Sequence, residues 1–338
     1  MRSLLYPLLC ILSLLTLCGC GSPSFLVTPV ANSSALEEET VVAGRGWFAS
    51  KVAIIEVEGM LANTKSGGFL QATENPLSLF TQQLERAQGD PSVKAIVLRV
   101  NSPGGTVSSS DAMYAMLKDF RKKTGKPVVA SIQEVGASGA YYVSCASDKI
   151  VAQPTSVVGS IGVIFESMEF SGTLDKIGAR AWAITSGPLK DMGSPFKPLA
   201  QPEREVMQQM VDEYFKRFVG IVRQNRAVTE APADDLTYYK KHEYAGIFSG
   251  RVFSGEEAKK LGLVDQTGLL NDAIKLAQDL AKSPDSAVIL YKRPYGYSGS
   301  IYASTTTPPP KAEVTNINLP GASGLLPSGF YYLWRPGL

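Results

Sequence analysis

Short apolar runs, rich in β-branched side chains, recur along the chain between residue 51 and residue 291. They read VAIIEV, AIVLRV, PVVASI, KIVAQ, SVVGSIGVIF, AWAITS and AVILY, and helical segments intervene at several points. Because each run is apolar almost throughout instead of at alternate positions, it predicts a strand that is covered on both faces. The pattern therefore predicts an α/β domain built on a buried sheet.

The longest predicted helix begins near the sequence QPEREVMQQM. Its apolar residues recur at steps of three and four, and they are Met207, Val211, Tyr214, Phe218 and Ile221. This spacing predicts one apolar face packed into the core, not a ligand site. The region of about 240 residues is long enough for a substantial core, and it contains no internal repeat.

The first twenty residues are of a different kind. Arg2 precedes an apolar run from Leu4 to Leu17, which is shorter than the roughly 20 residues that a spanning helix needs. The pattern predicts an export signal. Its end, LCGC, resembles a bacterial lipobox, in which Cys20 would follow the cleavage point and carry the lipid. A plain secretory signal and an uncleaved anchor are the alternatives.

Composition divides the remainder into three parts. Residues 21–48 are polar and predict a tether between membrane and domain. Residues 49–292 form the predicted folded domain, and residues 293–338 form a tail rich in Pro, Gly and Thr that predicts irregular structure. The tail closes with the aromatic sequence FYYLW. Three placements are the alternatives for this aromatic segment: on the domain, on a neighbouring subunit or at the lipid interface.

Charge and cysteine content exclude several classes of protein. The net charge is +2 and basic residues do not cluster, so no nucleic-acid partner is expected. Of the cysteines, Cys10 and Cys18 would leave with the signal and Cys20 would carry lipid, which leaves only Cys145 and no internal disulfide. No Cys/His cluster has metal-ligand spacing, so neither a zinc site nor another cofactor is expected.

Two glycine-containing segments follow predicted strands and could serve acyl-transfer chemistry. In GASGAYYVS, Ser138 stands among small residues at the start of a helix, where its oxygen can face a cleft while Gly139 offers a backbone N–H. In RVNSPGG, the glycines allow close approach of a backbone N–H to a negatively charged oxygen. The alternatives are a helix N-cap for the serine and an ordinary turn for Pro-Gly-Gly.

The general base for this serine has to be a residue other than the usual histidine. The chain has one histidine, His242, which lies in a charged stretch without a partner pattern. Lys190 lies in SGPLKDMGSPF, where glycines and prolines flank it closely. A lysine acts as a general base only when neutral, which requires burial that lowers its pKa from about 10.4. The alternative is an ordinary surface lysine.

Five motifs occur in the order found in the signal peptide peptidase A family: VNSPGG, GASGAYYVS, TSVVGSIGV, SGPLKDMGSPF and GRVFSGEEAKKLGLVDQTG. The chain resembles this family of Ser-Lys serine proteases over about residues 51–290. The resemblance implies a single catalytic domain with the crotonase/Clp-protease-like β-β-α superhelical spiral. It also implies Ser138 as the nucleophile and Lys190 as the general base. Ser160 would hydrogen-bond the lysine, and the oxyanion hole would consist of the backbone N–H groups of Gly105 and Gly139.

The resemblance extends to assembly and substrate. The family's short form has one repeat, as this chain has, and it assembles into rings whose subunits complete one another's active sites. We therefore expect a homo-oligomer, with an octamer as one form, in which Lys190 reaches Ser138 of a neighbouring subunit. The implied function is a membrane-associated serine endopeptidase that degrades cleaved signal peptides and similar apolar peptides. It would act in the bacterial cell envelope, anchored by lipid on Cys20 to a membrane that the sequence leaves open.

Two alternatives come from other classes of protein. One is a catalytically silent, membrane-attached scaffold or peptide-binding ring on the same fold. The other is a crotonase-type acyl-CoA enzyme, which shares paired oxyanion N–H groups. The combination of Ser138, Ser160 and Lys190 argues against both alternatives. The predicted export signal also argues against the acyl-CoA enzyme.

Overall fold

The computed structural model describes residues 35–46, 49–64, 74–228, 246–294, 301 and 329–334. All of them belong to one compact unit, Ala35–Leu338. The predicted signal, Cys20 and His242 lie outside the described residues. None of the helices in the described ranges is both long enough and apolar enough to cross a bilayer.

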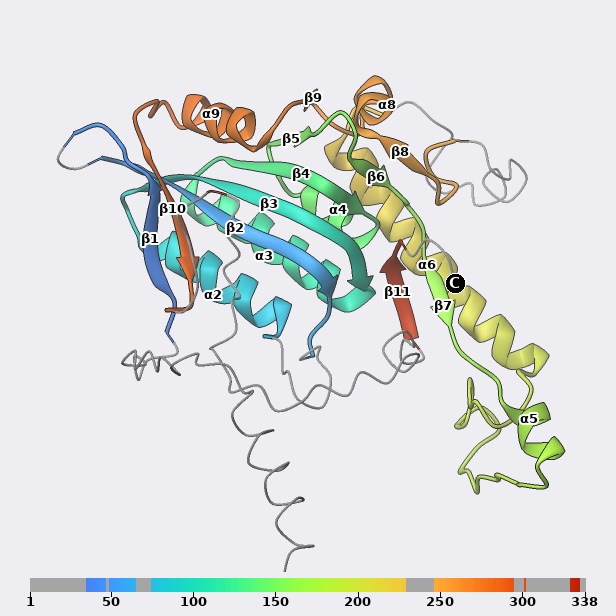
Figure 1. Ribbon diagram of the computed structural model, residues 1–338. Coiled ribbons are helices and arrows are strands. Elements are labelled where there is room, and N and C mark those ends of the chain that lie inside the picture. The colour runs from blue at the N-terminus through green and yellow to red at the C-terminus, as the bar shows by residue number, and fades with distance from the viewer. Residues whose placement is uncertain are drawn as a thin grey trace, which may run out of the picture. The chain divides into compact units, whose positions relative to one another are not determined.

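The described strands form one mixed sheet (Figure 1). In spatial order, its main path consists of β1 (Glu37–Val42), β10 (Ala287–Lys292), β2 (Lys51–Leu61), β3 (Val93–Thr106), β4 (Val128–Ala137), β5 (Lys149–Ala152) and β9 (Gln266–Thr267). The neighbours from β10 to β9 are parallel, and β1 is antiparallel to β10. Four short strands lie off this path: β6 (Val157–Gly159), β7 (Ile164–Glu166), β8 (Val252–Ser254) and β11 (Gly329–Leu333).

Helices cover both faces of the sheet (Figure 1). Helix α9 (Leu270–Leu280) lies on one face, and α2 (Pro76–Gly89), α3 (Val107–Thr124) and α4 (Gly139–Ser144) lie on the other. Val52 and Ile54 pack in the cluster with α9, whereas Ala53 and Ile55 pack in the cluster on the opposite face. Because alternate residues of one strand are buried on opposite faces, the strand sequence is apolar without interruption.

The longest helix is α6 (Gln201–Asn225). Three of its predicted core residues, Met207, Phe218 and Ile221, are buried, and Val211 and Tyr214 are half-buried. The remaining described helices are the short α5 (Ser171–Lys176) and α8 (Gly255–Lys260).

Three segments differ from the expectations drawn from composition and periodicity. The run AWAITS is not a strand: Trp182 is 81% exposed and Ile184 is 90% exposed, because no element within the described ranges covers this run. Residues 37–42, in the predicted tether, form β1 on the edge of the sheet. The aromatic end of the predicted irregular tail forms β11, which lies on the domain.

Candidate active site

Ser138 occupies a sharp turn between β4 and α4. It is 1% exposed, and its φ of 52° and ψ of −117° are unusual for a residue with a side chain. The Ser138 N–H donates to the Gly159 carbonyl at 2.7 Å, and the Ser138 carbonyl accepts from the Tyr142 N–H at 2.9 Å. The Ser138 side chain makes no capping hydrogen bond. The hydroxyl is therefore not used as the N-cap that the sequence left open, and the strained backbone is held by its neighbours.

Ser160 leaves the sheet beside Ser138. Strands β4 and β6 are parallel, with Ala137 opposite Gly159, so the next residue of each strand is one of the two serines. Ser160 is 8% exposed and also has a positive φ, of 49°. Its N–H donates to the Arg251 carbonyl at 2.8 Å. The register of the sheet thus brings two of the candidate site residues together.

The candidate oxyanion donors also converge. A methyl group placed on Gly104, whose φ is +100°, would lie 2.6 Å from the backbone nitrogen of Gly139. A methyl group placed on Gly139 would lie 3.2 Å from the backbone nitrogen of Gly105. Both nitrogens therefore border one small region next to Ser138, and the approach is so close that no side chain fits there. An oxyanion hole likewise needs two backbone N–H groups close to the nucleophile.

Two serines that the sequence analysis passed over support this region. Ser102 Oγ donates to the Gly59 carbonyl at 2.6 Å and accepts from the Gly104 N–H at 3.1 Å, which fixes the loop before the glycines. Ser110 Oγ donates to the Thr106 carbonyl at 3.0 Å. A methyl group on Gly139 would lie 2.3 Å from this oxygen. Their only signal in the sequence was a run of hydroxyl residues beside the Pro-Gly-Gly turn.

Lys190 is not part of this cluster within a single chain. It lies in the segment between β7 and α6, where its N–H donates to the Gly187 carbonyl at 3.2 Å in a turn. The Lys190 side chain is exposed. Among the described residues it makes no hydrogen bond with Ser138 or Ser160. The glycines and prolines that flank Lys190 predicted a buried setting, and one chain does not provide it.

The segment that carries Lys190 exposes large apolar side chains. The most exposed of them are Phe170, Ile177, Trp182, Ile184, Leu189 and Phe196, at 41% to 90%. The segment is nevertheless ordered at its end, because Lys197 donates to Asp191 at 2.6 Å and to Glu203 at 2.6 Å. These bonds raise the pKa of Lys197, and its ammonium lowers the pKa of Asp191.

Cys145 is the one cysteine within the described ranges, and it is fully buried at the C-terminal end of α4. Burial raises the pKa of its thiol to about 12, so the thiol stays protonated at neutral pH. Because the thiolate is the nucleophilic form of cysteine, Cys145 does not compete with Ser138 for this role.

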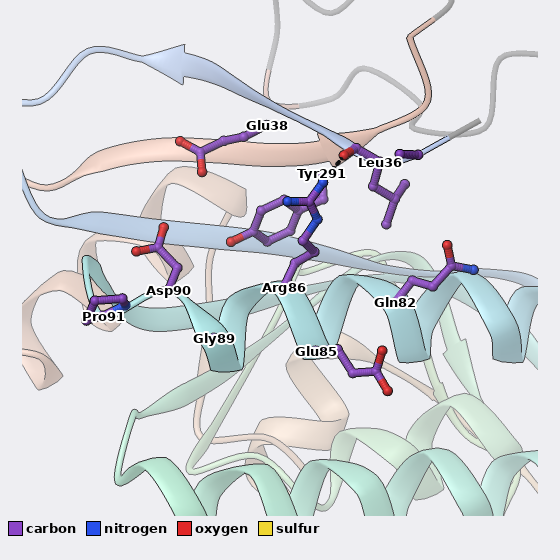
Figure 2. Close-up of a pocket in the computed structure, with 10 residues that line it drawn as sticks. Leu36, Glu38, Gln82, Glu85, Arg86, Gly89, Asp90, Pro91 and Tyr291 are labelled. Carbon is purple, nitrogen blue, oxygen red and sulfur yellow. Dashed lines mark hydrogen bonds between the residues drawn. The ribbon is translucent and has the colours of Figure 1, made fainter. Parts of the chain in front are cut away.

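A separate cavity of about 710 Å³ lies between β1 and α2 (Figure 2). Its lining includes Glu38, Arg86, Asp90 and Tyr291, and none of the candidate site residues. The Tyr291 hydroxyl is buried, and among the described residues it has no hydrogen-bond partner. The cavity is therefore distinct from the cluster around Ser138.

The parallel sheet, with a constrained serine and close-packed glycines at the carboxyl ends of β3, β4 and β6, defines an α/β protein of the crotonase/Clp-protease type. The family model described as peptidase family S49 matches residues 120–283. A putative signal peptide peptidase SppA of Enterococcus faecium is 33% identical over 260 residues, which cover 77% of this chain and 72% of that protein. The chain belongs to peptidase family S49. This membership confirms both the family resemblance and the predicted fold class.

Other relatives differ in how much of their length is matched. A putative protease of Methanocaldococcus jannaschii is 39% identical over 62% of this chain and 63% of its own length. Protease 4 of Haemophilus influenzae is 32% identical over 71% of this chain but only 36% of its own length. A solved membrane-bound stomatin-specific protease overlaps with a TM-score of 0.41 at 14% identity, over 67% of this chain and 84% of that one.

Proposed function

We propose that this protein is a membrane-associated serine endopeptidase that uses a Ser-Lys dyad to degrade cleaved signal peptides and similar apolar peptides. The observation that carries the proposal is the geometry of Ser138, a buried residue held at a positive φ beside the backbone nitrogens of Gly105 and Gly139. A serine that does not cap its helix, next to two close-packed glycine N–H groups, is suited to attack a carbonyl and stabilise the oxyanion that results.

In the proposed mechanism, neutral Lys190 takes the proton from Ser138 Oγ as this oxygen bonds to the peptide carbonyl carbon. The N–H groups of Gly105 and Gly139 stabilise the oxyanion of the tetrahedral intermediate. Lys190 then gives the proton to the leaving amine, and the C–N bond breaks. Water, deprotonated by the same lysine, hydrolyses the acyl-enzyme and regenerates the Ser138 hydroxyl. Ser160 orients the amine by a hydrogen bond.

A second copy of the chain supplies Lys190 in this proposal. Within one chain the base is exposed, whereas the nucleophile and the candidate oxyanion donors are assembled. The same segment exposes Trp182 at 81% and Ile184 at 90%, which is apolar area that a neighbouring subunit can bury. Burial against that neighbour would also remove water from the amine and favour its neutral form. A closed ring, with an octamer as one form, repeats this contact around its circumference.

The substrate class and location rest on one relative, one sequence motif and one general property of strand edges. A relative that this chain matches along 72% of that relative's length bears the name signal peptide peptidase. The N-terminal sequence ends in the lipobox-like LCGC, whose Cys20 would anchor the enzyme in the cell envelope. A groove built from strand edges binds extended peptides of many sequences through main-chain hydrogen bonds. Cleaved signal peptides are apolar and lie at the membrane where such an anchor holds the enzyme.

The test uses the full chain in detergent with a synthetic signal peptide and a fluorophosphonate probe. We expect the wild-type protein to cleave the peptide and to be labelled on Ser138, and Ser138→Ala and Lys190→Ala to be folded but inactive. Lys122→Ala, at an exposed lysine near the end of α3, is the matched control and should retain activity. A folded, unlabelled and inactive wild-type protein would favour the catalytically silent ring instead.

A further inference from the structure

The last described strand, β11, fills a position beside the candidate active site (Figure 1). One edge pairs antiparallel with the end of β3, with Tyr332 opposite Gly105. The other edge pairs antiparallel with β7, with Phe330 opposite Phe165. The strand therefore bridges the glycine loop and the strand that follows Ser160. An extended peptide added between two exposed strand edges would occupy the same position.

The carbonyl oxygen of Tyr332 lies beside the candidate oxyanion donors. A methyl group on Gly104 would lie 2.1 Å from this oxygen, and a methyl group on Gly139 would lie 3.1 Å from it. Two residues further on, the Trp334 N–H donates to the Pro103 carbonyl at 2.8 Å. The chain thus places the carbonyl group of Tyr332 next to the N–H groups that are proposed to polarise the carbonyl of a substrate.

An aromatic pocket holds the Tyr332 side chain, which is fully buried. Its ring stacks on Tyr142 of α4 at 5.0 Å between centroids and lies 4.8 Å from the ring of Phe218 of α6. Its hydroxyl donates to the Tyr214 carbonyl at 2.9 Å. Burial raises the pKa of this hydroxyl, which keeps it protonated and able to donate. The pocket therefore satisfies both the apolar ring and the polar end of a tyrosine.

We propose that Gly329–Leu333 is a tethered, substrate-like inhibitor that occupies the peptide groove of its own chain, anchored by Tyr332. The proposal rests on the proposed peptidase function. Main-chain pairing to β3 and β7 holds the strand, and the pocket of Tyr142 and Phe218 selects the aromatic side chain. Because the strand is covalently linked, its pairing is intramolecular, and it competes with free peptides at an effective concentration set by its linker. The same pocket then favours substrates with an aromatic residue at the corresponding position.

The kinetic test compares three full-length proteins with a synthetic signal peptide as substrate. Tyr332→Ala removes the anchor, so the groove is open for a larger fraction of the time. We expect about a tenfold lower apparent KM with kcat changed by less than about twofold. Trp334→Ala is the matched control, because the bond that Trp334 makes to Pro103 uses the backbone N–H and survives the substitution. An unchanged or higher KM in Tyr332→Ala would mean that β11 is a permanent part of the scaffold.

A binding measurement separates this proposal from the catalytic one. The labelled peptide GFYYLW is titrated onto full-length Ser138→Ala protein, with and without Tyr332→Ala. We expect about tenfold tighter binding when Tyr332 is replaced, because the tethered competitor is weakened. Equal binding to both proteins would overturn the proposal. Tighter binding without hydrolysis by any variant would overturn the peptidase function but support β11 as the occupant of the groove.

A milder variant covers the case in which Tyr332→Ala does not fold. Tyr332→Phe keeps the ring and loses only the hydrogen bond to the Tyr214 carbonyl. Its KM should fall by about threefold, in line with the loss of one hydrogen bond. In addition, free GFYYLW should inhibit the wild-type protein competitively. Failure of both effects would overturn the proposal.

Discussion

The backbone N–H of Ser138 is hydrogen-bonded to the carbonyl oxygen of Gly159 at 2.7 Å, so the loop of the candidate nucleophile is fixed to the residue before Ser160. This bond continues the parallel pairing of β4 and β6 one step beyond Ala137. Any change that moves Gly159 will therefore move both serines, and the position offers a way to test their coupling without altering either hydroxyl.

Gly159→Ala should lower both stability and activity. Gly159 has a φ of +103°, and a methyl group there would lie 2.8 Å from the Phe253 ring. We expect an unfolding free energy lower by about 1–3 kcal/mol, because a strained conformation is imposed on alanine. Denaturant titration measures this loss, and peptide hydrolysis should fall by at least about tenfold. Full activity in the destabilised variant would show that the two loops are not coupled.

Gly139→Ala should affect the transition state more than peptide binding. Its methyl group would lie 2.3 Å from Ser110 Oγ and 3.2 Å from the Gly105 nitrogen. We expect kcat to fall by roughly 100-fold, because displacement of an oxyanion donor costs about 3 kcal/mol. Steady-state kinetics with a signal peptide measures kcat and KM separately.

The double variant Gly139→Ala/Ser110→Ala is the control for crowding. It removes the closest contact of the new methyl group, the Ser110 oxygen, and leaves the contact with the Gly105 nitrogen. We expect thermal stability to recover in part while kcat stays low. Recovery of kcat as well would indicate that the loss came from crowding and not from the oxyanion donors.

Two inactive proteins should restore activity when they assemble together. In the proposed ring, Ser138→Ala retains Lys190, and Lys190→Ala retains Ser138, so some mixed interfaces contain one intact pair. Co-expression of the two variants produces mixed oligomers without a step of unfolding and reassembly, and a hydrolysis assay measures their activity. We expect up to about a quarter of the wild-type activity, which is the fraction of intact pairs in a random mixture. An inactive mixed oligomer would show that serine and lysine act within one chain.

Ile184→Asp should break the assembly. Ile184 is 90% exposed in the single chain, and a charge there opposes its burial against a neighbour. Sedimentation velocity should show smaller species with little hydrolysis. Leu269→Asp, at a side chain that is 52% exposed on another part of the surface, is the matched control and should keep the wild-type size. An active monomer of Ile184→Asp would contradict the shared site.

The carboxylate of Asp265 should make stability depend on pH. Burial alone would raise its pKa, but the Ile150 N–H at 2.8 Å and the Arg226 guanidinium at 2.7 Å hold the pKa below its ordinary value. The charged form therefore stabilises the fold above the ordinary carboxyl pKa of about 3.9, and this contribution is lost as the pH falls through the lower folded value.

Asp265→Asn should accordingly lower the unfolding free energy by about 2 kcal/mol at pH 7, the size expected for hydrogen bonds to a charged group. Urea titrations at pH 7 and at pH 3 compare the variant with the wild type. The difference between the two proteins should shrink at pH 3, because below about 3.9 the unfolded wild type takes up a proton on Asp265 that the folded form resists. A difference that does not change with pH would contradict the lowered pKa.

The periodicity of the sequence predicted the buried sheet well, because the physical cause is local. In β2, Val52 faces α9 and Ala53 faces the opposite layer, so both must be apolar. Periodicity could not predict β1, because its charged sequence becomes a strand only through pairing of Glu37 with Lys292, far away in the chain. The exposed run AWAITS shows the converse, since an apolar run forms a strand only where another element covers it.

The candidate site was predicted in part. The small residues beside Ser138 and the glycines of the Pro-Gly-Gly turn indicated which backbones can approach closely, and the structure brings them together. The positive φ of Ser138 and Ser160 could not be read from the sequence, because serine seldom adopts it. The contact of Lys190 with Ser138 depends on surfaces outside one chain and stays a prediction.

The outermost strand of the sheet, β1, begins with three consecutive glutamates. Extended apolar peptides tend to add to any bare strand edge and seed aggregation there, and charged side chains discourage it. A protein that acts on such peptides, as proposed above, would face this hazard continuously. The charged side chains of β1, two of which pair with Lys51 and Lys292, thus make this edge a poor site for the addition of a further strand.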